Sequence, residues 1–354
     1  MAAALVWLGC RTVRAKLVVP MVQTMRADHA RFWPEASRDL RTLDALTNFQ
    51  TPTSGHDASA FLESAIGFEA SSGTRPQTSG AHAFPLDLAE RMRGDAWMKL
   101  DPAATKALDM SWLSALREFE FWDVWPAAFA GPKPVSVIHI PVPRYIELQR
   151  WSRARLLRGR LEGDAAAAHD DVVHLAALMF STHTCVGTFS ATLISLDLAD
   201  FEGPNSNESS SQASARRALR APCFALQTVL TREQLRQAIA DFGATSYGCV
   251  AIAEAAAAAL ARPGLRSERA EQFALIGAEL ARVENNCRLT PLVRAWNQMP
   301  GYEVQDLVDD SKDFLGGLTW TRHLPIVSAT LFAVLDSLAT PTWSNAYRPK
   351  VTPP

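Results

Sequence analysis

The sequence predicts an all-α fold of packed amphipathic helical hairpins, and the segment 143–200 is the main observation behind this prediction. Pro143 suits the first turn of a helix, where its missing N–H has no intrahelical partner to lose. Gly163 can end that helix in a left-handed conformation, and the side chain of Asp164 can cap the next one. Apolar residues at helical spacing recur in the second half of the chain, which extends the same pattern.

The two helices of this hairpin have different predicted faces. In the second helix, Asp170, His174 and Ser181 share a polar face opposite an apolar stripe. The stripe consists of Ala168, Val172, Leu175, Ala176 and Met179. The first helix has a broader apolar face, into which Arg150 and Arg158 intrude with side chains long enough to keep their charges in water. That face consists of Ile146, Trp151, Ala154, Leu157 and Leu161.

The N-terminal half contains shorter predicted elements. A helix is expected over 22–49, with an interruption at Pro34, because a proline inside a helix removes a hydrogen bond. Asp57, Asp101 and Asp109 each stand where a carboxylate can cap the start of a helix.

The C-terminal half carries stronger helix signals. Thr231 and Gln234 form a capping box, and Gly243 closes the helix that follows. Its apolar stripe consists of Leu235, Ala238, Ile239 and Phe242. The alanine-rich segment 248–261 allows a neighbouring helix to approach closely. The next predicted stripe consists of Phe273, Ile276, Leu280 and Val283. A further apolar stretch, 324–338, contains Asp336, which argues against a membrane span.

The organisation along the chain follows from its polar breaks. We expect an apolar and basic segment at 1–20 and a helical domain at 21–202. A second helical domain, or a continuation of the first, is expected at 215–340, followed by a loose tail at 341–354. The one predicted exception to the helical pattern is a short strand near 135–140, where β-branched residues lie between prolines.

The block from Ile146 to about Asp200 resembles TPR-like helical hairpins. The resemblance lies in a helix, the Gly163–Asp164 turn and an alanine-rich second helix with Leu175. It covers about one hairpin, and no period of about 34 residues recurs elsewhere. The chain as a whole, helical with an apolar N-terminus, resembles an uncharacterised family of envelope-anchored bacterial proteins. The resemblance implies scaffolding or partner binding, and it supplies no catalytic residues.

The charge balance excludes a nucleic-acid-binding surface built on net charge. The chain has 354 residues, a net charge of −2 and an isoelectric point near 6.5, which provides no overall attraction for phosphates. The local exception is a cluster on the first helix of the hairpin, Arg150, Arg153, Arg155, Arg158 and Arg160. We interpret these arginines as a solvated helical face.

The N-terminal segment suggests a membrane tether. Residues 2–9 are apolar but too few to cross a bilayer. Three interpretations stay open: the start lies within a longer anchor or signal segment, Leu8-Gly9-Cys10 is a lipoprotein processing site with lipidation of Cys10, or the segment is a buried or frayed N-terminus. We therefore expect a bacterial cell-envelope location, membrane-anchored or periplasmic, rather than the cytoplasm. The other cysteines are Cys185, Cys223, Cys249 and Cys287, which either pair in disulfides or act as small buried hydrophobes.

Histidine and aspartate residues between His169 and His183 invite a metal hypothesis. His169 and His174 are five residues apart and diverge around a helix, whereas metal pairs on one helix need a spacing of three or four. Asp170 and His174 have that spacing, but a surface hydrogen bond explains it. We expect no metal and no cofactor, and a metal-dependent helical enzyme using His174 is the third hypothesis.

The segment 112–125 combines aromatic and acidic residues. Glu118, Glu120 and Asp123 are the candidate catalytic acids, and Trp122 and Trp125 are the candidate binding residues. Aromatic faces beside carboxylates suit sugar rings and glycan hydrolysis. The competing interpretation is a core helix whose aromatic residues point inward and whose acids face water.

These observations give a leading hypothesis and an alternative. The first is an envelope-associated helical scaffold or partner-binding protein, favoured over an enzyme, which binds a protein partner and contacts a membrane through its N-terminus.

 The alternative is a cell-wall glycan-binding or glycan-hydrolysing protein that uses the 112–125 region.

Overall fold

The computed structural model describes residues 19–68, 80–128, 142–202, 213–215, 217–218, 230–260 and 270–298. Within these ranges the chain is 77% helical, with 12 α-helices and no strand, so the all-α prediction is confirmed. Two isolated β-bridges, Asp57–Phe121 and Phe68–Pro143, are the extended pairings among these residues. The strand expected near 135–140, the apolar stretch 324–338 and Cys10 lie outside the described residues.

The first part of the chain contains one long helix and several short ones. Helix α2 spans Val19–Thr47, α3 Ser59–Ile66, α4 Leu86–Arg91, α5 Ser111–Ala115 and α6 Trp125–Ala128. Short 3-10 turns lie at Gly94–Lys99, Pro102–Thr105 and Leu116–Glu118. The predicted interruption at Pro34 is wrong, because α2 continues through it. Asp57, Asp101 and Asp109 each accept a backbone N–H at the start of a helical segment, as expected.

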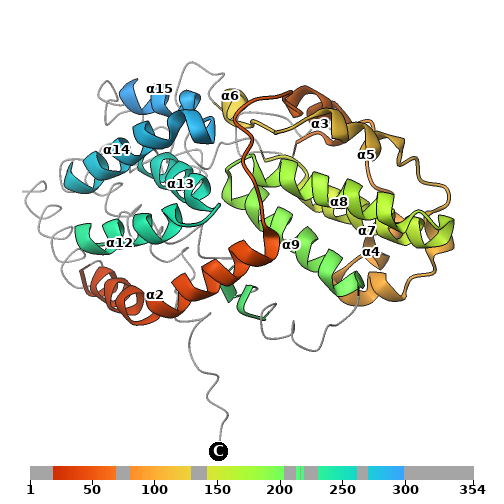
Figure 1. Ribbon diagram of the computed structural model, residues 1–354, viewed down its shortest axis with the longest axis horizontal. Coiled ribbons are helices and arrows are strands. Elements are labelled where there is room, and N and C mark those ends of the chain that lie inside the picture. Colours follow the sequence, from red (N-terminus) through yellow and green to blue (C-terminus); the bar gives the residue numbers. More distant parts are fainter. Residues whose placement is uncertain are drawn as a thin grey trace, which may run out of the picture.

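The second part consists of longer helices. Helix α7 spans Tyr145–Glu162, α8 Ala165–Phe180 and α9 Cys185–Glu202. Helix α12 spans Arg232–Gly243, α13 Gly248–Leu260, α14 Ala270–Cys287 and α15 Thr290–Gln298. Helices α7, α8 and α9 pack on one another as a three-helix bundle, and α12 to α15 form a second group (Figure 1). The two groups meet where α13 contacts α9, while α6 contacts α15 and α2 packs on α12. Their buried residues form one continuous apolar core.

The α7–α8 hairpin agrees with the sequence in its turn but differs at its caps. Gly163 ends α7 with a left-handed φ of 76°, as predicted. Pro143 lies ahead of the helix, in the bridge with Phe68, and α7 begins at Tyr145. Asp164 stands at the N-cap of α8 without a side-chain cap hydrogen bond. Its carboxylate instead forms a charge-assisted pair with Arg155 at 2.9 Å.

The predicted buried faces are largely correct. The apolar stripes of α8 and α12 are fully buried, and so are Trp151, Ala154 and Leu157 of α7. Ile146 is 62% exposed and Leu161 is also exposed, so these two assignments to the core are wrong. Ser181 was assigned to the solvent face, yet it is buried, because its hydroxyl accepts the backbone N–H of Trp122 at 2.7 Å. Thr231 and Gln234 form the predicted capping box.

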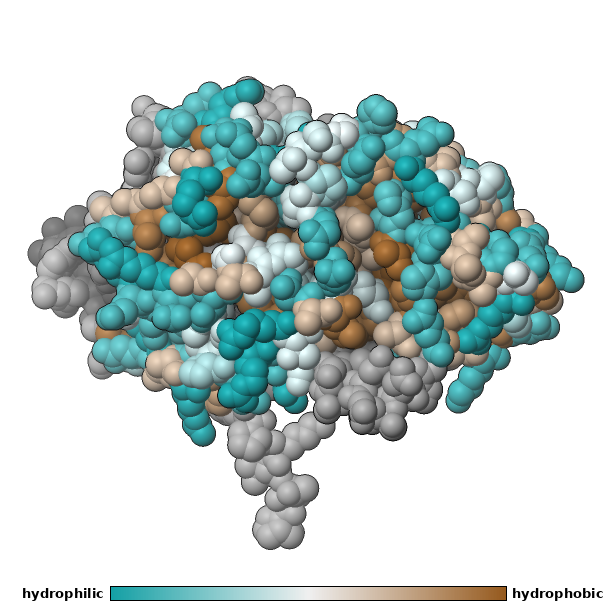
Figure 2. Space-filling view, viewed as in Figure 1, coloured by the Kyte–Doolittle hydropathy of each residue, from teal (hydrophilic) through white to brown (hydrophobic). Residues whose placement is uncertain are grey.

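One face of the molecule carries apolar side chains over the α8–α9 region, mixed with polar ones (Figure 2). The exposed large apolar residues of the bundle include Val173 on α8, and Val186 and Phe189 on α9. No helix in the described part of the chain is both long enough and apolar enough to cross a membrane.

Candidate functional site

The segment 112–125 is not one helix. It consists of α5, a 3-10 turn ending at Glu118, an extended stretch and the start of α6. Trp122 and Trp125 are 2% and 1% exposed, so their rings belong to the core. Enclosed rings offer no face to a sugar in this conformation, and the interpretation as core aromatics therefore fits the geometry. The interpretation as a continuous helix does not.

The three candidate acids of this segment have different environments. Glu118 is exposed. Glu120 is exposed as well, and its carboxylate accepts the backbone N–H of His56. Asp123 is half-buried and accepts the backbone N–H of Trp125 at 3.0 Å, so it caps the start of α6. Two of the three acids thus have a visible structural task, which is to hold the extended stretch in place.

Asp123 is the acid with an altered titration. The pKa of Asp123 is raised to about 6, because burial and the charge of nearby Asp57 outweigh the hydrogen bond from Trp125 and the charge of Arg288. Asp57 itself accepts the N–H groups of Ser59 and Asp123 at 3.0 and 3.1 Å. A carboxylate with a raised pKa beside another is a feature of acid–base sites, but here both carboxylates receive backbone N–H groups that a substrate cannot replace.

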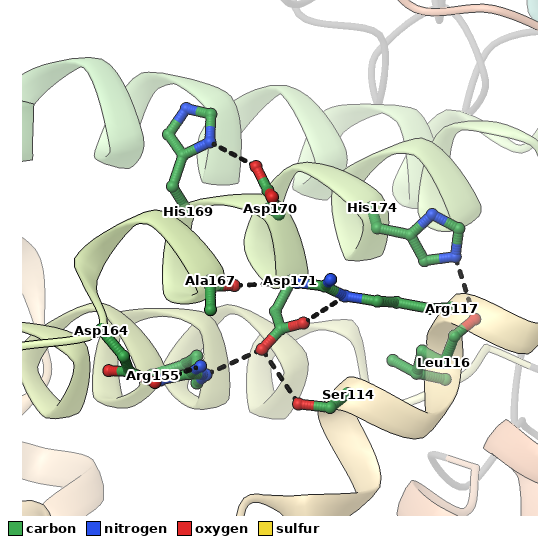
Figure 3. Close-up of polar contacts among 10 residues, drawn as sticks. All are labelled: Ser114, Leu116, Arg117, Arg155, Asp164, Ala167, His169, Asp170, Asp171 and His174. Atoms are coloured by element: carbon green, nitrogen blue, oxygen red, sulfur yellow. Dashed lines mark hydrogen bonds and ion pairs between the residues drawn. The ribbon is translucent and has the colours of Figure 1, made fainter. Parts of the chain in front are cut away.

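His169 and His174, two of the histidines considered as metal ligands, point to different partners (Figure 3). His169 lies 3.4 Å from Asp170, on the outer side of α8, and 3.2 Å from Glu202. The ring of His174 points toward the backbone oxygen of Leu116, 2.9 Å away. Across the described ranges, no group of three or more histidine, cysteine or acidic side chains has the arrangement of a metal site.

Asp171, which the sequence did not single out for a structural role, forms the centre of a buried charge cluster (Figure 3). Its side chain is 2% exposed and lies 2.9 Å from Arg155 and 2.7 Å from Arg117. Ser114 donates a further hydrogen bond at 3.1 Å. The pKa of Arg155 is raised, because the hydrogen bonds and charges of Asp164 and Asp171 outweigh the cost of its burial. Every carboxylate oxygen of Asp171 therefore faces a donor, as a buried charge requires.

The arginine cluster of α7 is the main correction to the sequence analysis. Arg153 and Arg155 are buried rather than solvated. Arg153 binds both carboxylate oxygens of Asp197 on α9, at 2.8 and 2.9 Å. Arg158 donates to backbone oxygens near Lys106, and Arg160 donates to the backbone oxygen of Phe201. These arginines hold α7 against three other segments of the chain.

The turn between α8 and α9 forms a second polar centre inside the protein. Ser181 to Thr184 are all buried. His183 has a left-handed backbone, with a φ of 49°, which is uncommon for a residue other than glycine. Burial, together with the charge of Arg288, lowers the pKa of His183 to about 4. His183 is therefore neutral near pH 7.

Glu254 of α13 reaches the same turn. Its carboxylate accepts the backbone N–H of Cys185 at the start of α9. The residue as a whole is partly exposed, but its carboxyl group is desolvated, which raises the pKa of Glu254 to about 7 against the effect of that hydrogen bond. Tyr145, whose hydroxyl lies 3.5 Å from that of Thr184, is fully enclosed. Sequence periodicity could not identify this centre, because its members come from three helices.

Two helices of the second group are joined covalently. Cys249 of α13 and Cys287 of α14 form a disulfide with a Cα–Cα distance of 5.4 Å. Cys185 is disulfide-bonded as well. Of the two interpretations of the cysteines, pairing therefore applies to these three. The spacing of the cysteines gave no means of choosing the pairs.

Comparison of the chain with family models, with curated proteins and with solved structures finds no match. The fold and the two polar centres described above are therefore the basis for a functional proposal.

Proposed function

We propose that this chain is a helical scaffold protein that works in an oxidising compartment of the bacterial cell envelope and binds a partner protein there. The observation that carries the proposal is the Cys249–Cys287 disulfide, together with the disulfide-bonded state of Cys185. Disulfides persist in exported proteins and are rare where cytosolic reductants act on them. A tether through the N-terminal segment or through Cys10 belongs to the same proposal.

The roles of the charged residues support a scaffold rather than an enzyme. The carboxylates of buried Asp171 and partly buried Asp197 are engaged by arginines of the same chain. Asp123 and Glu120 bind backbone N–H groups. These interactions fix the relative positions of helices, and rigid positions are what a scaffold needs for presenting a surface. Apolar side chains exposed on α7, α8 and α9 are compatible with contacts to another protein.

The compartment can be tested by trapping thiols in intact source cells. Cells are treated with a membrane-permeant alkylating reagent before lysis, and the masses of peptides containing Cys249 and Cys287 are measured. We expect both cysteines to be protected until a reductant is added, and the protein to fractionate with the envelope. Alkylation of both cysteines without reductant, in a soluble cytosolic fraction, would refute the proposal.

The partner role needs a separate measurement. Chemical crosslinking in intact cells, followed by size analysis of the purified complex, should give a defined assembly larger than one chain. Purification of the protein as a free monomer from crosslinked envelope fractions would leave the location intact but contradict partner binding. Binding of soluble cell-wall glycan fragments, with a shift of the Trp122 or Trp125 fluorescence, would instead favour the glycan alternative.

A further inference from the structure

The turn after helix α14 carries an arginine that crosses to the N-terminal part of the chain. Helix α14 ends at Cys287, and Arg288 follows with a left-handed backbone, at a φ of 56°. The guanidinium of Arg288 donates to the backbone oxygen of Thr53 at 3.0 Å. Its carbon Cζ lies 3.3 Å from the centroid of the Phe121 ring. Arg288 therefore joins the group of helices α12 to α15 to two segments of the N-terminal part.

The contact with Phe121 lies where the extended stretch 119–123 is held in place. Phe121 is 3% exposed, and its backbone oxygen accepts the N–H of Ala58 at 2.8 Å, just before α3. The charge of Arg288 also acts on Asp123 in the same stretch, where it opposes the rise in the pKa of that carboxyl group. Arg288 thus covers one side of this junction.

The Cys249–Cys287 disulfide fixes the residue directly before this arginine. Cys287 is 1% exposed at the end of α14, and Cys249 is half-buried in α13. The ends of helices open at the lowest free energy in a folded protein, and a cross-link to a neighbouring helix restrains such an end. Helices α13 and α14 also pack on one another. The local effect of the bond therefore falls on the last turn of α14 and on Arg288.

We propose that the Cys249–Cys287 disulfide is a redox-sensitive clamp that holds Arg288 on Phe121, and that its reduction releases the stretch 119–123. A dithiol reductant supplies two electrons and two protons: the Sγ–Sγ bond breaks, both cysteines become thiols, and the reductant is oxidised to its own disulfide. With the end of α14 free, the guanidinium leaves the ring, and the face of Phe121 that it covers becomes accessible. The inference does not depend on the proposed scaffold function.

Hydrogen exchange in the stretch 119–123 tests the proposal. The double substitution Cys249→Ser with Cys287→Ser opens the clamp without reducing the disulfide of Cys185, which a reductant would also attack. We expect the amides of 119–123 to exchange about tenfold faster than in the wild type, because a cation–π contact and a hydrogen bond are lost. Arg288→Ala should give the same increase. Removal of the disulfide in the Arg288→Ala background should add none.

A control variant and two contrary results make the test decisive. Arg282→Ala removes an exposed arginine of the same helix that pairs with Glu279, and exchange in 119–123 should stay unchanged. A general loss of stability would speed exchange in 119–123 equally with and without Arg288, and this additive result would overturn the proposal. Unchanged exchange in Arg288→Ala would overturn it as well, even if the cysteine variant failed to fold.

Discussion

The carboxyl group of Glu254 gives the sharpest prediction about pH and stability. Its pKa is about 7 in the folded protein, against an ordinary value of 4.5. Between these values the folded state holds a proton that the unfolded state has released. Folding therefore becomes less favourable as the pH rises from 4.5 to 7, and the full cost is present above pH 7. Each pKa unit corresponds to about 1.4 kcal/mol, so the cost is about 3 kcal/mol at most, and about 2 kcal/mol after allowance for the partial exposure of the residue.

Glu254→Gln removes this cost while it keeps an oxygen that can accept the N–H of Cys185. The free energy of unfolding of the variant, measured with urea, should rise relative to wild type by about 2–3 kcal/mol between pH 4 and pH 8. Variant and wild type are compared at each pH. His29 and His183, whose pKa values are lowered to about 4, also make the stability depend on pH. This contribution is the same in both proteins, so it cancels in the difference.

A control and a contrary result complete this test. Glu233→Gln removes an exposed carboxyl group, which separates the role of the buried group from the loss of one negative charge. Stability curves of Glu254→Gln and wild type that run parallel from pH 4 to pH 8 would show that the carboxyl group is hydrated in the folded state. The reasoning from burial would then be refuted.

Three further predictions concern packing, charge and the disulfide. Asp171→Asn leaves Arg155 and Arg117 without a full counter-charge and should cost about 3–5 kcal/mol in urea unfolding, whereas the exposed Asp170→Asn should change stability by less than about 0.5 kcal/mol. Gly159→Ala should lower the free energy of unfolding by about 1–2 kcal/mol, because the added methyl would lie 2.5 Å from the Cβ of Ala168. The cost of this clash is larger than the gain in helix propensity from alanine. Replacement of Cys249 and Cys287 by serine should lower the free energy of unfolding by about 4 kcal/mol, from the loss of a cross-link that spans 38 residues.

Each of these predictions has its own contrary outcome. Equal losses in Asp171→Asn and Asp170→Asn would mean that the buried cluster contributes no more than a surface pair. A Gly159→Ala protein as stable as wild type would show that α7 and α8 can separate without cost. If reduction of the wild-type protein leaves the midpoint of urea unfolding unchanged, the Cys249–Cys287 bond does not restrain the unfolded chain.

The sequence by itself determined the features that depend on neighbours within about one helical turn. The capping box at Thr231, the left-handed end of α7 at Gly163 and the buried stripes of α8 and α12 follow from such local patterns. Each needs information from residues three or four positions apart, and the printed sequence contains it.

The tertiary structure decided which polar residues are inside. Arg155 looks like a solvated residue in the sequence, because its partner Asp171 is 16 residues away, and Arg117 joins the same carboxylate from 54 residues away. Ser181 is a second example, because its buried hydroxyl accepts the backbone N–H of Trp122, which lies 59 residues earlier in the chain. Burial of a charge or a hydroxyl depends on partners that only folding brings together, and helical periodicity has no means of naming them.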